Sequence, residues 1–172
     1  DGVVLSYQGR TAVFIPQMNF SVIPQLPAAP LHVLYPNALW QNLYDQLLFD
    51  SSEEAPGVAG FGIFPGTVPR FAANGLKVPH MGWNRLDFQR GDCPLLAGVE
   101  DGSFVYFVHS FYCLPAKPEV VCGTTEYGIK FCSMLWAGNV FATQFHPEKS
   151  QAVGLRMLEN FVPPYDATVA RK

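Results

Sequence analysis

Hydrophobic and polar positions form readable patterns mainly in the second half of the chain. Short apolar runs bounded by turn-forming residues predict strands at 60–66, 78–83 and 104–111. The near-continuous apolar character of 104–111 indicates a strand buried on both faces. Segments 127–136 and 140–145, joined by Ala-Gly-Asn, predict a β-hairpin.

Two helical segments frame these strands. Residues 46–49 have the pattern of the last turns of a helix. A final helix follows Ser150, whose hydroxyl is suited to cap its N-terminus, and a Pro-Pro pair ends it. One apolar stripe at helical spacing consists of Val153, Met157, Leu158 and Phe161.

The N-terminal part of the chain does not show such order. Residues 1–5 predict the end of a loop and a short buried strand. Segment 6–40 is apolar, yet no helix of ordinary length fits, because each proline in a helix interior costs about 3 kcal/mol. These prolines are Pro16, Pro24, Pro27, Pro30 and Pro36. We therefore predict one domain over 1–172, in which residues 6–45 are atypical.

Composition narrows the class of protein. A chain of 172 residues with 49% hydrophobic and 15% charged residues suits one soluble domain with a buried core. The net charge of −3 gives no reason to expect nucleic acid. No apolar run reaches the roughly 18 residues of a membrane span, and no signal peptide is visible in the sequence. We expect a cytoplasmic protein, truncated at its N-terminus.

The four cysteines predict neither a disulfide framework nor a metal site. They are Cys93, Cys113, Cys122 and Cys132, and no two of them form a Cys-x-x-Cys pair. In a cytosolic chain they are expected to be free thiols. No cluster of His and Cys has the spacing of zinc ligands, so no metal is expected.

The segment 144–150, Gln-Phe-His-Pro-Glu-Lys-Ser, contains the most informative chemistry. It predicts a strand, a tight turn and a helix, which places His146 at a strand end, where open α/β sheets bind ligands. Glu148 can then bond one imidazole nitrogen, leaving the other free to take a proton from a nucleophile. On spacing alone, however, a His-x-Glu pair is more often a surface pair.

The same segment, with Gly154-Leu155 and residues 158–161, resembles the signature of class I glutamine amidotransferases. Motifs at 77–84, 105–112 and 47–66 resemble the branch of that family which serves histidine biosynthesis, the glutaminase subunits of imidazole glycerol phosphate synthase. The resemblance covers residues 1–5 and 46–162. It implies an α/β fold with a three-layer, flavodoxin-like open sheet, truncated at its N-terminus. The motif at 79–84 disfavours another branch, the glutaminase of pyridoxal phosphate synthase.

The resemblance also implies roles for particular residues. A cysteine thiolate attacks the glutamine carboxamide, with His146 as general base and Glu148 as its orienter. Gln46 matches a substrate-contacting glutamine, and Ser110 and Phe111 match a strand end that holds the substrate's amino-acid end. The released ammonia passes to a (β/α)8-barrel cyclase subunit. No cofactor is implied.

Other residues have both a functional and an ordinary interpretation. Trp83, Asn84 and Lys149 are candidates for the interface with the cyclase, although Trp83 is also suited to core packing and Lys149 to solvent. His80 and His109 could be ligands or acid–base groups. Isolated histidines such as these are more often hydrogen-bonded and partly buried.

The resemblance fails at the nucleophile. Counting back from Gln46, Asn42 stands where the family has cysteine, and Trp40 and Tyr44 replace glycines that relieve a strained turn. Cys113, the nearest substitute, has the character of a small buried hydrophobe. The family's oxyanion loop is also absent after residue 5. Two explanations compete: residues 6–45 are read in a shifted frame, or the chain is a non-catalytic subunit that only binds and regulates the cyclase.

Overall fold

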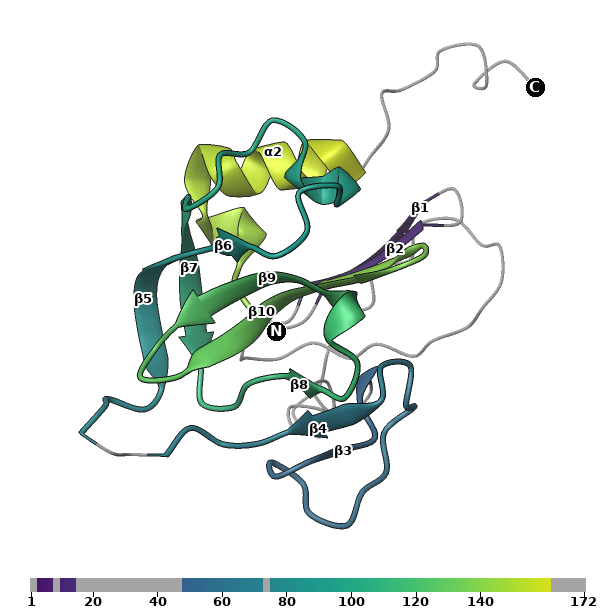
Figure 1. Ribbon diagram of the computed structural model, residues 1–172, viewed down its shortest axis with the longest axis vertical. Coiled ribbons are helices and arrows are strands. Elements are labelled where there is room, and N and C mark those ends of the chain that lie inside the picture. Colours follow the sequence, from purple (N-terminus) through teal and green to yellow (C-terminus); the bar gives the residue numbers. More distant parts are fainter. Residues whose placement is uncertain (1–2, 8–9, 15–47, 73–74, 162–172) are drawn as a thin grey trace.

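A mixed β-sheet of six strands forms the centre of the computed structural model, which describes residues 3–7, 10–14, 48–72 and 75–161 (Figure 1). Its strand order is β1-β2-β11-β10-β9-β6. Neighbouring strands are antiparallel, except that β2 and β11 run parallel. The six strands are β1 (Val3–Tyr7), β2 (Arg10–Phe14), β6 (Asp87–Phe88), β9 (Val121–Glu126), β10 (Lys130–Ala137) and β11 (Val140–Thr143).

Two smaller sheets and a helix complete the described part of the chain. Strands β3 (Ser51–Ser52), β4 (Gly66–Val68) and β8 (Leu114–Pro115) form one sheet, and β5 (His80–Arg85) pairs antiparallel with β7 (Phe104–His109). The helices are α2 (Gln151–Phe161) and the short 3-10 turns η1 (Pro94–Leu96), η2 (Pro118–Val120) and η3 (Pro147–Lys149). None of these helices is long and apolar enough to cross a membrane.

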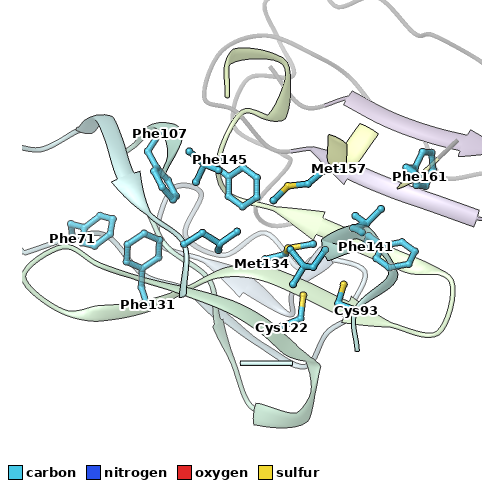
Figure 2. Packing of buried hydrophobic residues seen from close by; sticks show 14 residues of the cluster. Phe71, Cys93, Phe107, Cys122, Phe131, Met134, Phe141, Phe145, Met157 and Phe161 are labelled. Carbon is cyan, nitrogen blue, oxygen red and sulfur yellow. The ribbon is translucent and has the colours of Figure 1, made fainter. Parts of the chain in front are cut away.

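Two hydrophobic cores lie on opposite faces of the six-stranded sheet. Figure 1 shows α2 on one side of β9 and β10, and β3, β4 and β8 on the other. On the helix side, Met157 and Phe161 pack with Phe141 and Met134 of the sheet (Figure 2). The second core joins the small sheet to the opposite face and consists of Leu48, Phe49, Phe64, Val68, Cys113, Cys132, Leu135 and Ala142. The sheet is therefore covered on both faces, as an α/β layered fold requires.

Strands β9 and β10 contain two irregularities that cancel. Cys132 pairs with Thr124, but Met134 pairs with Gly123, so Ser133 is an extra residue in β10. Leu135 then pairs with Val121, which skips Cys122 in β9 and restores the original register. The extra residue in β10 changes which face each later side chain points to.

The predicted hairpin is confirmed. β10 and β11 pair from Met134↔Thr143 to Ala137↔Val140, and the turn between them contains Gly138 with a positive φ of 58°. The strand predicted at 78–83 is also present, as β5, but it begins at His80 after the Val78–Pro79 bond.

Two predictions about strands are wrong in part. β7 is a strand, but it is not buried on both faces: Val105 and Phe107 are fully buried, whereas Phe104 is 58% exposed. This alternation arises because only one face of β7 packs against the core. The strand expected at 60–66 is a loop, in which Gly62 has a positive φ of 58°, and β4 begins only at Gly66.

The N-terminal strand expected at 1–5 is present as β1, which continues to Tyr7 and pairs with β2. β2 lies inside the segment whose pattern was unreadable, and it extends the sheet beside β11. Residues 15–47 lie outside the described residues. Of the helix end predicted at 46–49, the described part agrees with the prediction, because Leu48 is helical and Phe49 is not. The nucleophile region around Asn42 stays a prediction.

Candidate active site

The backbone of His146 is fixed to strand β7 at the point where β11 has ended and η3 begins. The His146 N–H donates to the Tyr106 carbonyl at 2.9 Å. The buried Ser150 hydroxyl donates to the His146 carbonyl at 2.6 Å and accepts from the Tyr106 N–H at 3.0 Å. The side chain of His146 consequently starts from a rigid backbone.

Ser150 does not play the role predicted for it. Its hydroxyl is engaged with His146 and Tyr106, so it does not cap α2; the Gly154 N–H bonds to the Ser150 main-chain oxygen at 3.1 Å. The helix predicted to follow Ser150 is confirmed, since α2 begins at Gln151, which has a φ of 51°. A serine before a helix has the same sequence signature in either role, so only the position of β7 distinguishes the two.

His146 and Glu148 form the pair that the sequence predicted. The His146 Nδ1 lies 2.8 Å from the Glu148 Oε1. The imidazole is 4% exposed, whereas the carboxylate is 49% exposed. Partial burial is the largest single influence and acts to raise the pKa of Glu148. The hydrogen bond from His146, a backbone hydrogen bond and the charges of His146 and Lys149 together outweigh it, so the pKa lies below its ordinary value of 4.5. Glu148 is therefore ionised at neutral pH and accepts the Nδ1–H.

The opposite nitrogen of His146 is unusual. Because Nδ1 donates to a carboxylate, the neutral ring has a lone pair on Nε2. This Nε2 is buried and has no hydrogen-bond partner among the described residues, and the same holds for the Gln144 Nε2. Buried polar atoms without partners cost about 1–3 kcal/mol each and often mark sites of function.

This arrangement can perform general-base chemistry. Glu148 holds the ring in one tautomer and would stabilise the imidazolium formed when Nε2 takes a proton. The backbone bonds at His146 keep the ring in place during that transfer. No group of three or more His, Cys, Asp or Glu side chains in the described ranges is arranged to hold a metal ion.

Of the three residues expected to hold substrate, the structure describes two, Ser110 and Phe111. Ser110 and Phe111 follow directly on β7; the Ser110 carbonyl accepts from the Phe71 N–H at 3.0 Å, and Phe111 forms a bridge with Arg70. Ser110 lies four positions after Tyr106, about 13 Å along an extended strand. Gln46 lies outside the described residues.

Two of the three predicted interface residues have exposed side chains. Trp83 is 46% exposed and packs edge-on against Tyr106, with ring centroids 5.9 Å apart. Together with exposed Phe104 it lines a pocket of about 320 Å³ beside the start of α2. Lys149 is exposed, whereas Asn84 is half-buried and donates to the Glu126 carbonyl at 2.8 Å.

The four cysteines are buried, and none of them forms a disulfide. Burial raises the pKa of Cys132 to about 12, which makes its thiol a poor nucleophile. The Cys113 thiol donates weakly to the Gln144 Oε1 at 3.7 Å inside the second core. The described thiols thus have the character of core residues.

Comparison with known proteins identifies the family. The sequence pattern of "Glutamine amidotransferase class-I" matches residues 46–163, which contain His146 and Glu148. The chain belongs to the class I glutamine amidotransferase family. Membership of this family confirms the α/β fold expected from the motifs of the chain.

Individual relatives agree with the resemblance to the histidine-biosynthesis branch of the family. The amidotransferase chain is 52% identical over 122 residues to the "imidazole glycerol phosphate synthase subunit HisH" of Syntrophotalea carbinolica, covering 67% of this chain and 59% of that protein. The identically named protein of Thermococcus kodakarensis is 52% identical over 121 residues, covering 67% and 60%. That of Deinococcus radiodurans is 55% identical over 117 residues, covering 67% and 54%. The chain spans about three fifths of the length of the relatives that it matches.

Proposed function

We propose that this chain is the glutaminase subunit of an imidazole glycerol phosphate synthase, with glutamine as substrate and a cyclase barrel as cytoplasmic partner. The names of the relatives support the assignment. The observation that carries it is the geometry of His146, whose Nδ1 is bonded to Glu148 and whose buried Nε2 has no partner among the described residues.

In this proposal the His146 Nε2 takes the proton of a cysteine thiol as the sulfur attacks the glutamine carboxamide. The protonated ring then returns a proton to the departing ammonia, and water hydrolyses the thioester to glutamate. Ammonia passes to the cyclase. Because Asn42 stands at the cysteine position, the chain with this sequence is expected to hydrolyse no glutamine.

A chimera tests the proposal. Residues 46–172 of this chain are joined to the upstream segment of the Syntrophotalea carbinolica relative, which replaces residues 1–45. With the cyclase present, the chimera is expected to release glutamate from glutamine, and His146→Ala should abolish that release. A folded chimera that binds the cyclase but releases no glutamate would refute the assignment of residues 46–162.

The role of Glu148 has its own test in the chimera. Glu148→Gln removes the charge that stabilises the imidazolium, and a hydrogen bond to a charged group contributes about 1.5–3 kcal/mol. We expect kcat to fall about 10- to 100-fold. Glu159→Gln, the same change at an exposed carboxylate of α2, is the control and should leave kcat unchanged. Equal kcat values for both variants would contradict the orienting role.

A second candidate is a non-catalytic subunit that binds and regulates the cyclase. It is favoured by Asn42 and by the exposed apolar pair Trp83 and Phe104 beside a pocket. The chain should co-purify with the cyclase without glutaminase activity, and Trp83→Ala should weaken binding. Phe61→Ala, at a similarly exposed phenylalanine in the loop before β4, is the control. Failure of the unaltered chain to bind would reject this candidate.

A further inference from the structure

Two buried histidines outside the His146–Glu148 pair contact each other directly. His80 and His109 are opposite residues of β5 and β7, and the His80 Nδ1 lies 2.8 Å from the His109 Nε2. The His109 Nδ1 lies 2.7 Å from the Phe111 carbonyl oxygen. At the other end, the His80 Nε2 lies 3.2 Å from the Asn84 Nδ2. The four groups form one continuous hydrogen-bonded chain.

The direction of this chain is determined at one end. The Phe111 carbonyl can only accept, so the His109 Nδ1 bears the hydrogen and, in the neutral ring, its Nε2 accepts. The His80 Nδ1 must therefore donate, and the His80 Nε2 must accept from the Asn84 amide. The hydrogen position on His109 therefore determines the one on His80, and every hydrogen bond in the chain pairs one donor with one acceptor.

The amide of Asn84 is held in the orientation that this chain needs. Its Nδ2 also donates to the Glu126 carbonyl at 2.8 Å, and its Oδ1 accepts from the Arg85 N–H at 2.7 Å. A flipped amide would lose both bonds. The end of the chain at Asn84 is thus anchored independently of His80.

The surroundings keep both rings neutral. His80 lies between the rings of Tyr127 and Phe107, with centroids 4.0 and 4.7 Å away, and Phe71 packs edge-on against both histidines. Figure 2 shows Phe71, Phe107 and Phe131 gathered in this part of the core. Burial lowers the pKa of His80 to about 4 and that of His109 to about 3.

We propose that His80 and His109 are positioning residues, which form a directional relay that couples the half-buried Asn84 to the Phe111 carbonyl. The relay holds the strand end of Ser110 and Phe111 against β5. Its functional meaning rests on the proposed function: Asn84 lies where the cyclase is expected to dock, and Phe111 where glutamine is expected to bind. Docking that pulls on the Asn84 amide would then alter the strand end that holds substrate.

The first test is nitrogen-15 NMR of histidine-labelled full-length chain between pH 6 and 8. Both His80 and His109 are expected as neutral rings with the hydrogen on Nδ1. A ring with its hydrogen on Nε2, at either residue, would overturn the relay. This measurement needs no variant and no partner, so it is independent of whether the chain is a glutaminase.

The second test changes Asn84 and observes Phe111. Asn84→Asp presents only acceptors to the His80 Nε2, so His80 should gain a second proton and the Phe111 carbonyl carbon-13 resonance should move. Asn84→Leu has a similar size and neither donates nor accepts; here both rings should stay neutral with the hydrogen on Nδ1. If Asn84→Asp folds and leaves both His80 and the Phe111 resonance unchanged, the coupling is refuted.

A final experiment adds the cyclase barrel to the labelled chain. Movement of the Phe111 carbonyl resonance on binding, reduced in Asn84→Leu, is expected if docking acts through the relay. Binding without that movement would refute the coupling. Absence of binding would count against the proposed function instead, while the histidine tautomers measured on the chain alone would still decide the relay.

Discussion

Acidification should destabilise this protein through two of its buried histidines, His80 and His109. His80 and His109 titrate at an ordinary pKa of 6.5 when exposed, but burial lowers the pKa to about 4 and about 3 in the folded chain. Between pH 6.5 and 4 the unfolded chain therefore binds more protons than the folded chain, so the free energy of unfolding decreases as the pH falls.

The magnitude follows from the size of the pH step. Each pH unit between the two pKa values costs about 1.4 kcal/mol per histidine. From pH 6.5 to pH 5 each ring costs about 2 kcal/mol, and the two together cost about 4 kcal/mol. Glu148 does not contribute in this window, because its depressed pKa removes stability only below about pH 4.5.

Urea unfolding followed by tryptophan fluorescence at pH 7, 6 and 5 measures the effect. With a slope of about 2 kcal/mol per molar urea, the midpoint should fall by about 2 M between pH 7 and pH 5. His109→Gln retains a donor for Phe111 and an acceptor for His80, and should halve the pH dependence. Equal midpoints at pH 7 and pH 5 would refute the reasoning, as would an unchanged pH dependence in His109→Gln.

Two further substitutions test how the turn beside the site is held. Gly154→Ala places a Cβ onto the Pro147 carbonyl and should cost more than about 3 kcal/mol, whereas Gly91→Ala, with open space around its Cβ, should be nearly neutral in thermal unfolding. Ser150→Ala leaves the Tyr106 N–H without its acceptor and should cost about 1–3 kcal/mol, with faster hydrogen exchange at that amide. Unchanged exchange would contradict the bridging role of the hydroxyl.

The sequence predicted the strands whose signals are local. The β10–β11 hairpin is visible because Ala137-Gly138-Asn139 is a turn triplet between two apolar runs. β9 was not predicted, because Gly123 inside it weakens a strand pattern. The structure explains that glycine: a Cβ there would lie 2.7 Å from the Leu86 Cδ1 and 3.0 Å from the Met134 Cβ, so a larger residue would displace packed side chains of the core.

The contacts of the histidines also divide into those that the sequence could predict and those that it could not. His146 and Glu148 are two residues apart, so their contact could be predicted from spacing and from a family motif, and the 2.8 Å contact confirms it. The contact between His80 and His109 depends on the register of two strands whose histidines lie 29 positions apart. No local pattern fixes that register, so the sequence alone indicated only hydrogen-bonded, partly buried histidines.

The cancelling irregularities in β9 and β10 constrain how this domain can vary in length. Deleting Ser133 alone would shift every later pair of the two strands by one residue. It would also remove the Ser133 carbonyl, which accepts a hydrogen bond from the Gln144 N–H at 2.9 Å. That bond aligns the segment leading to His146. Deleting Cys122 alone would shift the register in the opposite sense. In related chains, therefore, the residues corresponding to Ser133 and Cys122 are expected to be gained or lost together, as a paired insertion or deletion.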